Sequence, residues 1–255
     1  MTERHTEAQS GLDRSSGLPL FLQIRQRLLT EILNWQMEDR HFPSDQQLAE
    51  RFHVSKMTIR QALANFVDQG LLERRRGRGT VVCDSRAVER LTPALDIDDQ
   101  YRMSGFLIET QVLSVRDREA ERAETRAFAL ADGEPVAEIK RLRSIGGVPV
   151  AFDYRIMPGT LGARCGFDAE TAKESIIDRL RAHNHVSRVQ WRLVAHTPDI
   201  AMAEYLQSAQ DEPMLTRHLR YLDQNGNPVM TGATTQRSDR LACEVTIDLD
   251  ETPSN

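Results

Sequence analysis

Two short helical segments between residues 43 and 70, each with its own start signal, constrain the fold of this 255-residue chain more than any other feature. Ser44 can cap the first segment, and Gln47 three residues later can complete a capping box. Ser55 can cap the second segment, whose apolar residues recur at helical spacing. A turn at His53-Val54 separates the two segments, and Gly70 marks the end of the second. The pattern predicts a helix-turn-helix.

A hairpin rich in arginine follows the second segment. Its four arginines lie close together: Arg74, Arg75, Arg76 and Arg78. Apolar residues on both sides of Gly77-Arg78-Gly79 predict two strands joined by a glycine turn. Glycine lets the backbone approach a groove wall closely, and an arginine between two glycines suits a narrow minor groove. With a preceding helix that we expect to end at Asn34 in the left-handed conformation, the pattern predicts a winged helix-turn-helix over residues 18–83.

Charge supports this interpretation only locally. The chain has a net charge of −5, which by itself argues against nucleic-acid binding. Residues 1–83, however, hold 12 Lys and Arg against 10 Asp and Glu, whereas residues 84–255 hold 21 against 28. The hairpin arginines therefore form a local basic patch in a weakly basic segment. A solvated charge run is the alternative explanation.

The residues expected to contact DNA lie at the starts of the two helical segments and in the hairpin. A recognition helix contacts base edges and phosphates from its first turns, and Arg can donate two hydrogen bonds to a guanine edge. The candidates are Ser44, Gln46, Ser55, Lys56, Thr58, Arg60, Gln61, Arg76, Arg78, Gly79 and Thr80. We expect Arg60 to read a base and Arg78 to bind DNA of any sequence.

Six motifs of the first eighty residues point to a known family. They are Leu18-Pro-Leu-Phe, Phe42-Pro-Ser-Asp, Leu48-Ala-Glu-Arg-Phe, Val54-Ser-Lys-Met-Thr-Ile-Arg-Gln-Ala-Leu, Gly70-Leu-Leu and Gly77-Arg-Gly-Thr-Val-Val. This segment resembles the DNA-binding domain of the GntR family, which implies that Lys56, Thr58, Arg60 and the hairpin bind DNA. Gln46 and Lys56 stand where that family usually has Arg. The usual operator preference therefore does not carry over, because Lys lacks the planar fork of Arg.

Residues 105–250 show the pattern of an α+β domain with an antiparallel sheet. Strand-like segments dominate at 106–115, 136–144, 148–157, 186–195, 215–223 and 228–237. Glycine turns at 145–147 and 224–227 predict two hairpins, and helical patterns interrupt the strands near 119–128, 172–182 and 199–208. We expect residues 84–104 to form a linker and residues 1–17 a disordered leader.

A looser set of motifs covers this second domain. They are Ile139-Lys-Arg-Leu-Arg, Gly147-Val-Pro-Val, Ser175-Ile-Ile-Asp-Arg-Leu, Ala203-Glu-Tyr-Leu, Gly226-Asn-Pro-Val and Arg237-Ser-Asp-Arg. Over residues 90–249 the layout resembles the effector-binding domain of the HutC subfamily of GntR regulators, called UTRA, which is related in fold to chorismate lyase. The resemblance implies a homodimer joined through this domain, which would bind a palindromic operator in double-stranded DNA.

Two arginines of the second domain suit an anionic ligand. Arg141 and Arg143 alternate onto one face of a predicted strand, and each guanidinium can grip a carboxylate or phosphate in a bidentate way. A solvent-facing pair is the alternative explanation. The family resemblance places the effector pocket at Arg141, Arg143, Asp153 and Ser175. Ser175 would begin a helix whose N-terminus holds an anion, and the expected effector is a small anionic metabolite.

No catalytic, cofactor or metal site is expected. His183-Asn184-His185 could ligate a metal, but no carboxylate or cysteine is spaced to complete the site. The three cysteines make no CxxC pair, and neither a nucleophile–base pairing nor a glycine-rich phosphate-binding motif is present. Without a long apolar stretch or an apolar N-terminal signal, we expect a cytoplasmic protein that does not span a membrane.

Two classes of function fit these patterns. The favoured one is a ligand-responsive transcription regulator, a repressor released from its operator by a small anionic metabolite. The alternative is an enzyme of lyase-like fold fused to a DNA-binding module, because a fold alone does not assign chemistry. Turnover of a bound small molecule would favour the enzyme, and ligand-dependent loss of DNA binding would favour the regulator.

Overall fold

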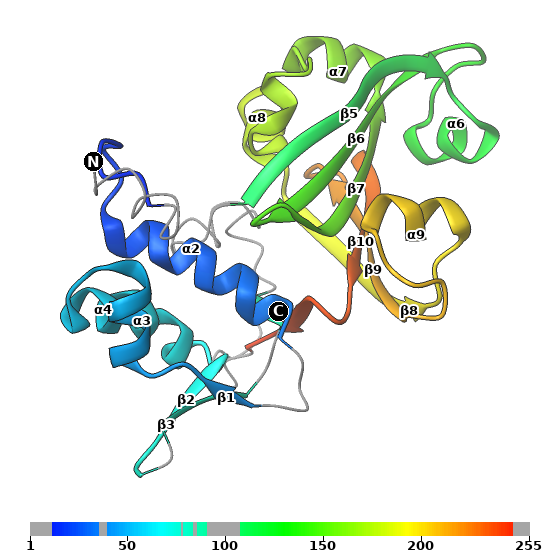
Figure 1. Ribbon diagram of the computed structural model, residues 1–255. Coiled ribbons are helices and arrows are strands. Elements are labelled where there is room, and N and C mark those ends of the chain that lie inside the picture. The colour runs from blue at the N-terminus through cyan, green and yellow to red at the C-terminus, as the bar shows by residue number, and fades with distance from the viewer. Residues whose placement is uncertain (1–11, 36–39, 78, 84–85, 91–107, 247–255) are drawn as a thin grey trace, which may run out of the picture. The chain divides into compact units, whose positions relative to one another are not determined.

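The computed structural model describes residues 12–35, 40–77, 79–83, 86–90 and 108–246. These residues form two compact units (Figure 1). The first unit contains the described residues up to 90 together with residues 239–246, and the second contains residues 108–238. The first unit is therefore built from both ends of the described chain.

Three helices form the centre of the first unit: α2 (Leu20–Leu33), α3 (Asp45–Phe52) and α4 (Lys56–Asp68). Both predicted serine caps are present, because Ser44 accepts the amide of Gln47 in a complete capping box and Ser55 accepts the amide of Thr58. His53 ends α3 in the left-handed conformation, with φ of 52°. Asn34 ends α2 as predicted, but with φ of −101° rather than left-handed. The helix-turn-helix is confirmed.

A small antiparallel sheet completes the winged helix-turn-helix. Its order is β1 (His41–Phe42), β3 (Gly79–Val82) and β2 (Leu72–Arg75). Strands β2 and β3 are the predicted hairpin, whereas the two-residue strand β1 was not predicted. Leu72 and Val82 face each other in the register and are both buried, so this face of the hairpin packs into the unit.

The far end of the chain supplies one more strand to the first unit. Strand β4 (Ala87–Arg90) pairs in parallel with β11 (Leu241–Glu244). The Ala87 amide donates to the Arg240 carbonyl at 2.8 Å, and both Ala87 and Leu241 are buried. Residues 241–244, which the sequence pattern placed in the second domain, therefore pair inside the first unit.

Residues 12–17 are ordered in the structure, although we expected the whole segment 1–17 to be a disordered leader. Leu12 is buried, with 4% of its surface exposed. The backbone of Asp13 bonds to the Gln23 side chain through both its amide, at 2.8 Å, and its carbonyl, at 2.7 Å. This segment is thereby attached to α2; residues 1–11 lie outside the described residues.

The second unit is built on a six-stranded antiparallel sheet of order β5-β6-β7-β10-β9-β8 (Figure 1). The strands are β5 (Ile108–Glu119), β6 (Pro135–Ile145), β7 (Val148–Pro158), β8 (Arg188–His196), β9 (Met214–Leu222) and β10 (Pro228–Arg237). Each of the two predicted glycine turns joins a pair of neighbouring strands, β6 to β7 and β9 to β10. The expected α+β class with an antiparallel sheet is confirmed.

Helices cover both faces of this sheet. They are α6 (Arg122–Phe128), α7 (Gly159–Cys165), α8 (Ile176–His183) and α9 (Ile200–Leu206), and a short 3₁₀ turn, Thr171–Lys173, precedes α8. One face packs Ile139 and Met157 against α7 and α8. The other packs Phe152 and Met214 against Leu206 of α9. Because side chains alternate along a strand, Arg141 and Arg143 share the face of Ile139, beneath α7 and α8.

Candidate DNA-binding surface and effector site

The recognition helix α4 presents its polar residues to the outside. Ile59, Leu63 and Phe66 are buried, whereas Lys56, Arg60 and Gln61 are exposed. At the start of the helix, the Ser55 hydroxyl accepts the Thr58 amide at 3.1 Å and lies 2.9 Å from the Thr58 hydroxyl. These five residues of the expected DNA-binding set therefore lie at the N-cap or in the N-terminal half of α4, outside its buried stripe.

The preceding helix α3 contributes two further members of the expected set, both exposed. Ser44 is occupied in its capping box, where its amide also donates to the Gln47 side chain at 2.8 Å. The Gln46 side chain donates to the carboxylate of Glu50, one helical turn away. Hydrogen bonds within α3 thus hold both side chains at the N-terminal end of this helix, which precedes the recognition helix.

Asp45 joins the two helices to the hairpin of β2 and β3, which is the wing of the winged helix-turn-helix. Its Oδ2 accepts the Arg60 Nε at 3.1 Å, and the two terminal nitrogens of Arg74 bond to Oδ2 and Oδ1 at 3.3 Å each. Sequence reasoning did not single out Asp45 or Arg74 individually. The sequence offered one signal for Asp45, which is an acidic residue in the first turn of a predicted helix. The helix dipole by itself favours an acidic residue there, so this signal did not point to a contact with arginines.

The wing places its expected DNA contacts unequally. Arg76 is exposed in the turn after β2, and Gly79 has φ of 80°, a conformation that favours glycine. Thr80 is only 7% exposed, so its side chain faces the interior, and its expected DNA contact stays a prediction. Arg78 lies outside the described residues, and its expected DNA contact stays a prediction.

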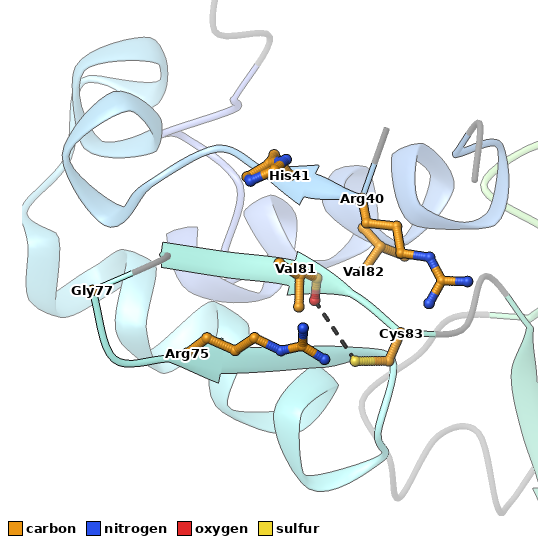
Figure 2. A pocket seen from close by; sticks show the side chains of 7 residues that line it. All are labelled: Arg40, His41, Arg75, Gly77, Val81, Val82 and Cys83. Atoms are coloured by element: carbon orange, nitrogen blue, oxygen red, sulfur yellow. Dashed lines mark hydrogen bonds between the residues drawn. The ribbon is translucent and has the colours of Figure 1, made fainter. Parts of the chain in front are cut away.

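A hollow of about 570 Å³ lies at the small sheet of the first unit (Figure 2). Its lining residues are Arg40, His41, Arg75, Gly77, Val81, Val82 and Cys83. Arg75 bonds to the Glu73 carboxylate at 2.9 Å. Burial, together with that carboxylate, raises the pKa of the Cys83 thiol and keeps it in its unreactive protonated form. The sequence pattern did not predict this hollow, because nothing local marks residues 40–42 as a partner of β3.

The ordered N-terminal segment contacts the turn of the helix-turn-helix. The Arg14 Nη2 donates to the carbonyl of His53 at 3.0 Å. His53 ends α3, where backbone carbonyls are left without helical partners. Arg14 therefore binds to the turn that leads into the recognition helix. The sequence pattern did not indicate this contact.

In the second unit, Asp153 binds two of the expected effector residues. Its Oδ2 accepts Arg141 Nη2 at 2.8 Å and Arg143 Nε at 2.7 Å. Strand register places Arg141 directly opposite Asp153, and all three side chains are 1% exposed. Arg141 and Arg143 are thus an interior pair, and the alternative of a solvent-facing pair is wrong.

Two more groups, which the sequence pattern did not indicate, complete this cluster. Arg155 Nη2 donates to Asp153 Oδ1 at 3.1 Å, and the Thr234 hydroxyl donates to the same oxygen at 2.7 Å. Burial alone would raise the pKa of Asp153, but the charges of Arg143, Arg155 and Arg141 outweigh it and hold the pKa well below its usual value. Asp153 therefore stays ionised. Arg155 could have been suspected from its alternation with Asp153, whereas Thr234 comes from a distant strand.

Arg141 also connects the cluster to the start of α8. Its Nη1 donates to the carbonyls of Ala172, at 3.1 Å, and Glu174, at 2.9 Å. The next residue, Ser175, caps α8 by accepting the amide of Asp178 at 3.2 Å. The structure thus brings the four expected effector residues together on the sheet face that α8 covers.

The two histidines that could have ligated a metal lie at the end of α8. His183 and His185 line an open hollow of about 450 Å³ there. Across the described residues, no three His, Cys, Asp or Glu side chains are grouped so that they could hold a metal ion. None of the helices in the described part of the chain combines the length and apolarity needed to cross a bilayer.

Comparison with known proteins agrees with both units. A family model described as UTRA domain matches residues 104–242, more than half of the chain. A model described as bacterial regulatory proteins, gntR family, matches residues 20–82. The two matched segments follow each other along the chain as the motifs predicted.

Individual relatives are transcription regulators. The HTH-type transcriptional repressor NagR of Bacillus subtilis is 28% identical over 235 residues, which cover 90% of this chain and 95% of NagR. The histidine utilization repressor of Pseudomonas putida is 28% identical over 138 residues, 54% of this chain and 56% of that protein. The crystal structure of PhnF from Mycobacterium smegmatis matches with a TM-score of 0.63, covering 88% of this chain and 99% of PhnF at 23% identity, which shows the shared fold.

These relatives set aside the alternative of an enzyme fused to a DNA-binding module, because the family consists of regulators. Taken with the winged helix-turn-helix and the antiparallel sheet domain, the matches show that the chain belongs to the GntR family of transcription regulators, in the HutC subfamily that carries a UTRA domain.

Proposed function

We propose that this regulator is a repressor that binds a palindromic operator in double-stranded DNA as a homodimer and releases it when a small anionic metabolite binds the UTRA domain. The exposed row Lys56, Arg60 and Gln61 on α4, beside a wing rich in arginine, carries the DNA-binding part of the proposal. Two relatives bear the name repressor, which supports repression. The proposal places the protein in the cytoplasm, with the DNA.

Arg60 is the residue that we expect to read sequence. It projects from the second turn of α4 with 59% of its side chain exposed. A guanidinium can donate two hydrogen bonds to the O6 and N7 atoms of guanine, which discriminates against the other bases. Lys56 and Arg76 are also exposed, and they suit phosphate contacts that position the protein without reading sequence.

The test begins with duplexes selected by the full-length protein from a random-sequence DNA pool. Arg60→Ala should weaken binding to a selected duplex by about 1–3 kcal/mol and relax the preference at one base pair. Binding to a scrambled duplex should change far less, because phosphate contacts dominate non-specific affinity.

Arg51→Ala is the matched control for the lost positive charge. Arg51 is on α3, pairs with Glu31 of α2, and is not in the expected DNA-binding set. This variant should affect selected and scrambled duplexes alike. Unchanged affinity of a folded Arg60→Ala variant for the selected duplex would refute the proposed recognition.

A homodimer follows from the small footprint of one winged helix. Two linked copies on a palindrome multiply affinity through effective concentration. Sedimentation of the full-length chain at micromolar concentration should show a dimer, and selected duplexes should contain two inverted half-sites. A monomer that protects a single half-site would contradict this part.

The effector part of the proposal rests on the cluster around Asp153. Arg141, Arg143 and Arg155 bring three guanidinium groups to one buried site next to the Ser175 cap of α8. Guanidinium groups in fixed positions, close to a helix N-terminus, are well suited to a carboxylate or phosphate group. The effector need only favour an arrangement in which the two winged helices no longer fit the half-site spacing, and a coupling of about 1–3 kcal/mol would loosen the operator about 5- to 150-fold.

Melting temperature and operator affinity measured with anions test this assignment. Sodium phosphate, citrate and acetate would each be compared with sodium chloride at equal ionic strength. An anion present at about 100 times its dissociation constant should add about 2.7 kcal/mol of stability and should weaken binding to the selected duplex.

Variants locate the binding. Arg143→Lys keeps the charge but loses the fork, and Ser175→Ala loses the cap, so both should reduce the response to the anion. Arg220→Lys, on the exposed side of β9, is the control and should respond like the unaltered protein. A full response in folded Arg143→Lys and Ser175→Ala proteins would rule out this pocket.

A further inference from the structure

Asp45 holds one arginine of the recognition helix and one of the wing. Its side chain is 17% exposed, compared with 59% for Arg60 and 43% for Arg74. The carboxylate therefore sits beneath the two guanidinium groups, at the first residue of α3. Three elements that were each expected to approach DNA meet at this one carboxylate.

The two arginines use different nitrogens. Arg60 donates to Asp45 through Nε, and within the described residues neither of its terminal nitrogens bonds to another group. Arg74 donates through both terminal nitrogens, one to each carboxylate oxygen. The end-on fork of Arg60 thus remains available for a ligand, whereas the fork of Arg74 is occupied by Asp45.

We propose that Asp45 is a positioning residue for sequence reading, which fixes Arg60 by its Nε so that the two terminal nitrogens can meet a guanine edge. Arg74 acts through Asp45, holding the carboxylate in place and balancing its charge. This inference rests on the proposed DNA binding and deepens it, because it assigns to Asp45 the discrimination between operator and other DNA.

The physical reason lies in the alternatives open to an exposed arginine. Without Asp45, the Arg60 side chain can turn to a neighbouring phosphate, and phosphate contacts carry no sequence information. Holding the side chain in its binding orientation beforehand also reduces the entropy that is lost on binding. The negative charge of Asp45 in addition disfavours any close approach of phosphate that does not engage Arg60 correctly.

Asp45→Asn and Glu73→Gln form a matched pair of variants. Each removes one negative charge from the same unit, and each removed carboxylate is bonded to an arginine of the wing. Glu73, however, bonds to Arg75 at 2.9 Å, and no described residue of the recognition helix bonds to it. A purely electrostatic effect on DNA affinity should therefore be alike in the two variants, whereas a positioning effect should be confined to Asp45→Asn.

The readout is the ratio of the affinities for a selected duplex and for a scrambled duplex of the same length and salt concentration. In Asp45→Asn this ratio should fall about tenfold, with unchanged or stronger binding to the scrambled duplex. In Glu73→Gln both affinities should rise together and the ratio should stay constant. Asp45→Glu keeps a carboxylate within reach and should retain most of the ratio.

A double-mutant cycle keeps the test informative if Asp45→Asn also affects folding. If Asp45 acts through Arg60, adding Asp45→Asn to Arg60→Ala should cause no further loss of the ratio. Equal ratios in Asp45→Asn and Glu73→Gln, or independent losses in the cycle, would overturn the inference. Failure of the underlying DNA-binding proposal looks different, because Arg60→Ala alone would then leave the ratio unchanged.

Discussion

Glu138 of β6 shows how this protein keeps charged residues in its interior. The side chain is 3% exposed and bonds to Arg116 at 2.9 Å, Arg118 at 2.8 Å and the Tyr154 hydroxyl at 3.1 Å. Burial alone would raise the pKa of Glu138, but these hydrogen bonds outweigh it and hold the pKa at about 2, below the usual 4.5. Glu138 and Asp153 lie on opposite faces of the sheet, so an ionised carboxylate bonded to arginines lies on each face.

Glu138→Gln should change the dependence of stability on pH. A carboxyl whose pKa is lowered by folding stabilises the protein above its unfolded pKa, and this stabilisation is lost as the pH falls through the folded pKa. The variant should therefore be less stable than the unaltered protein at pH 7, by about 1–3 kcal/mol. The difference should shrink as the pH falls from about 4.5 towards about 2. Urea unfolding of both proteins between pH 2 and pH 7 measures this.

Glu170→Gln is the control for this prediction. Its carboxylate is 81% exposed and pairs with Lys173 on the surface. Exposed pairs contribute little, so this variant should unfold almost like the unaltered protein. A stability difference for Glu138→Gln that stays constant down to pH 2 would contradict the assignment.

At the scale of single residues, the sequence pattern named part of each site. The alternation of Arg141 and Arg143 placed both on one strand face, and this is correct because strand periodicity is a local property. Thr80 was also expected at the DNA-binding surface, but its side chain is buried, which the sequence pattern did not indicate. Thr234 was missed, since only the pairing of β10 with β7 brings it to Asp153.

Among the described helices, α7 is the one that the sequence pattern did not predict. Its sequence GTLGARC contains two glycines, which lower helix propensity. The glycines have a packing reason instead. A Cβ on Gly162 would overlap the Cβ of Ala137, and a Cβ on Gly159 would approach Pro135 at 2.9 Å. Helix α7 is thus formed by its contact with β6 rather than by its own propensity.

Gly232 of β10 has the same kind of constraint, and Gly232→Ala tests it. The added Cβ would overlap the carbonyl oxygen of Tyr154 on β7, and a backbone atom in a central strand cannot move aside without disturbing the sheet. Overpacking of this kind costs about 1–3 kcal/mol or more. The variant should show a lower melting temperature.

Thr231→Ala is the neighbouring control on the same strand. Thr231 is half-buried, and its replacement removes atoms instead of adding them. This variant should lose less stability than Gly232→Ala. If Gly232→Ala melts like the unaltered protein, the close approach of β7 and β10 is wrong.

At the scale of the whole molecule, the chain does not divide into two consecutive domains. Strand β11 follows the last strand of the second unit and pairs with β4 of the first. Leu241 is 2% exposed and Ala87 fully buried, so the pairing belongs to the packed interior of that unit. The end of the effector-binding sheet is therefore connected directly to the DNA-binding unit through a strand of that unit.

Removal of β11 should destabilise the DNA-binding unit. A chain that ends at Ser238 loses the four residue pairs between β4 and β11 and exposes Ala87. Limited proteolysis should then cut the first unit faster, and the second unit should be affected less.

A chain that ends at Thr246 keeps β11 and serves as the control for this truncation. It should be cut at the same rate as the full-length protein. Equal protection of the first unit in the chains ending at Ser238 and at Thr246 would show that β11 contributes nothing to it.

The helix caps, the helix-turn-helix, the wing and the α+β class of the second unit could all be predicted from local sequence patterns. These depend on short-range signals: a serine that bonds three residues ahead, an apolar period and a glycine turn. Which polar groups meet depends on contacts between distant segments. Asp45 reaches Arg74 because α3 and β2 both contact α4, and Asp153 reaches Thr234 through strand register. Contacts of this kind join residues far apart in the chain, and no local pattern encodes the register or packing that brings them together.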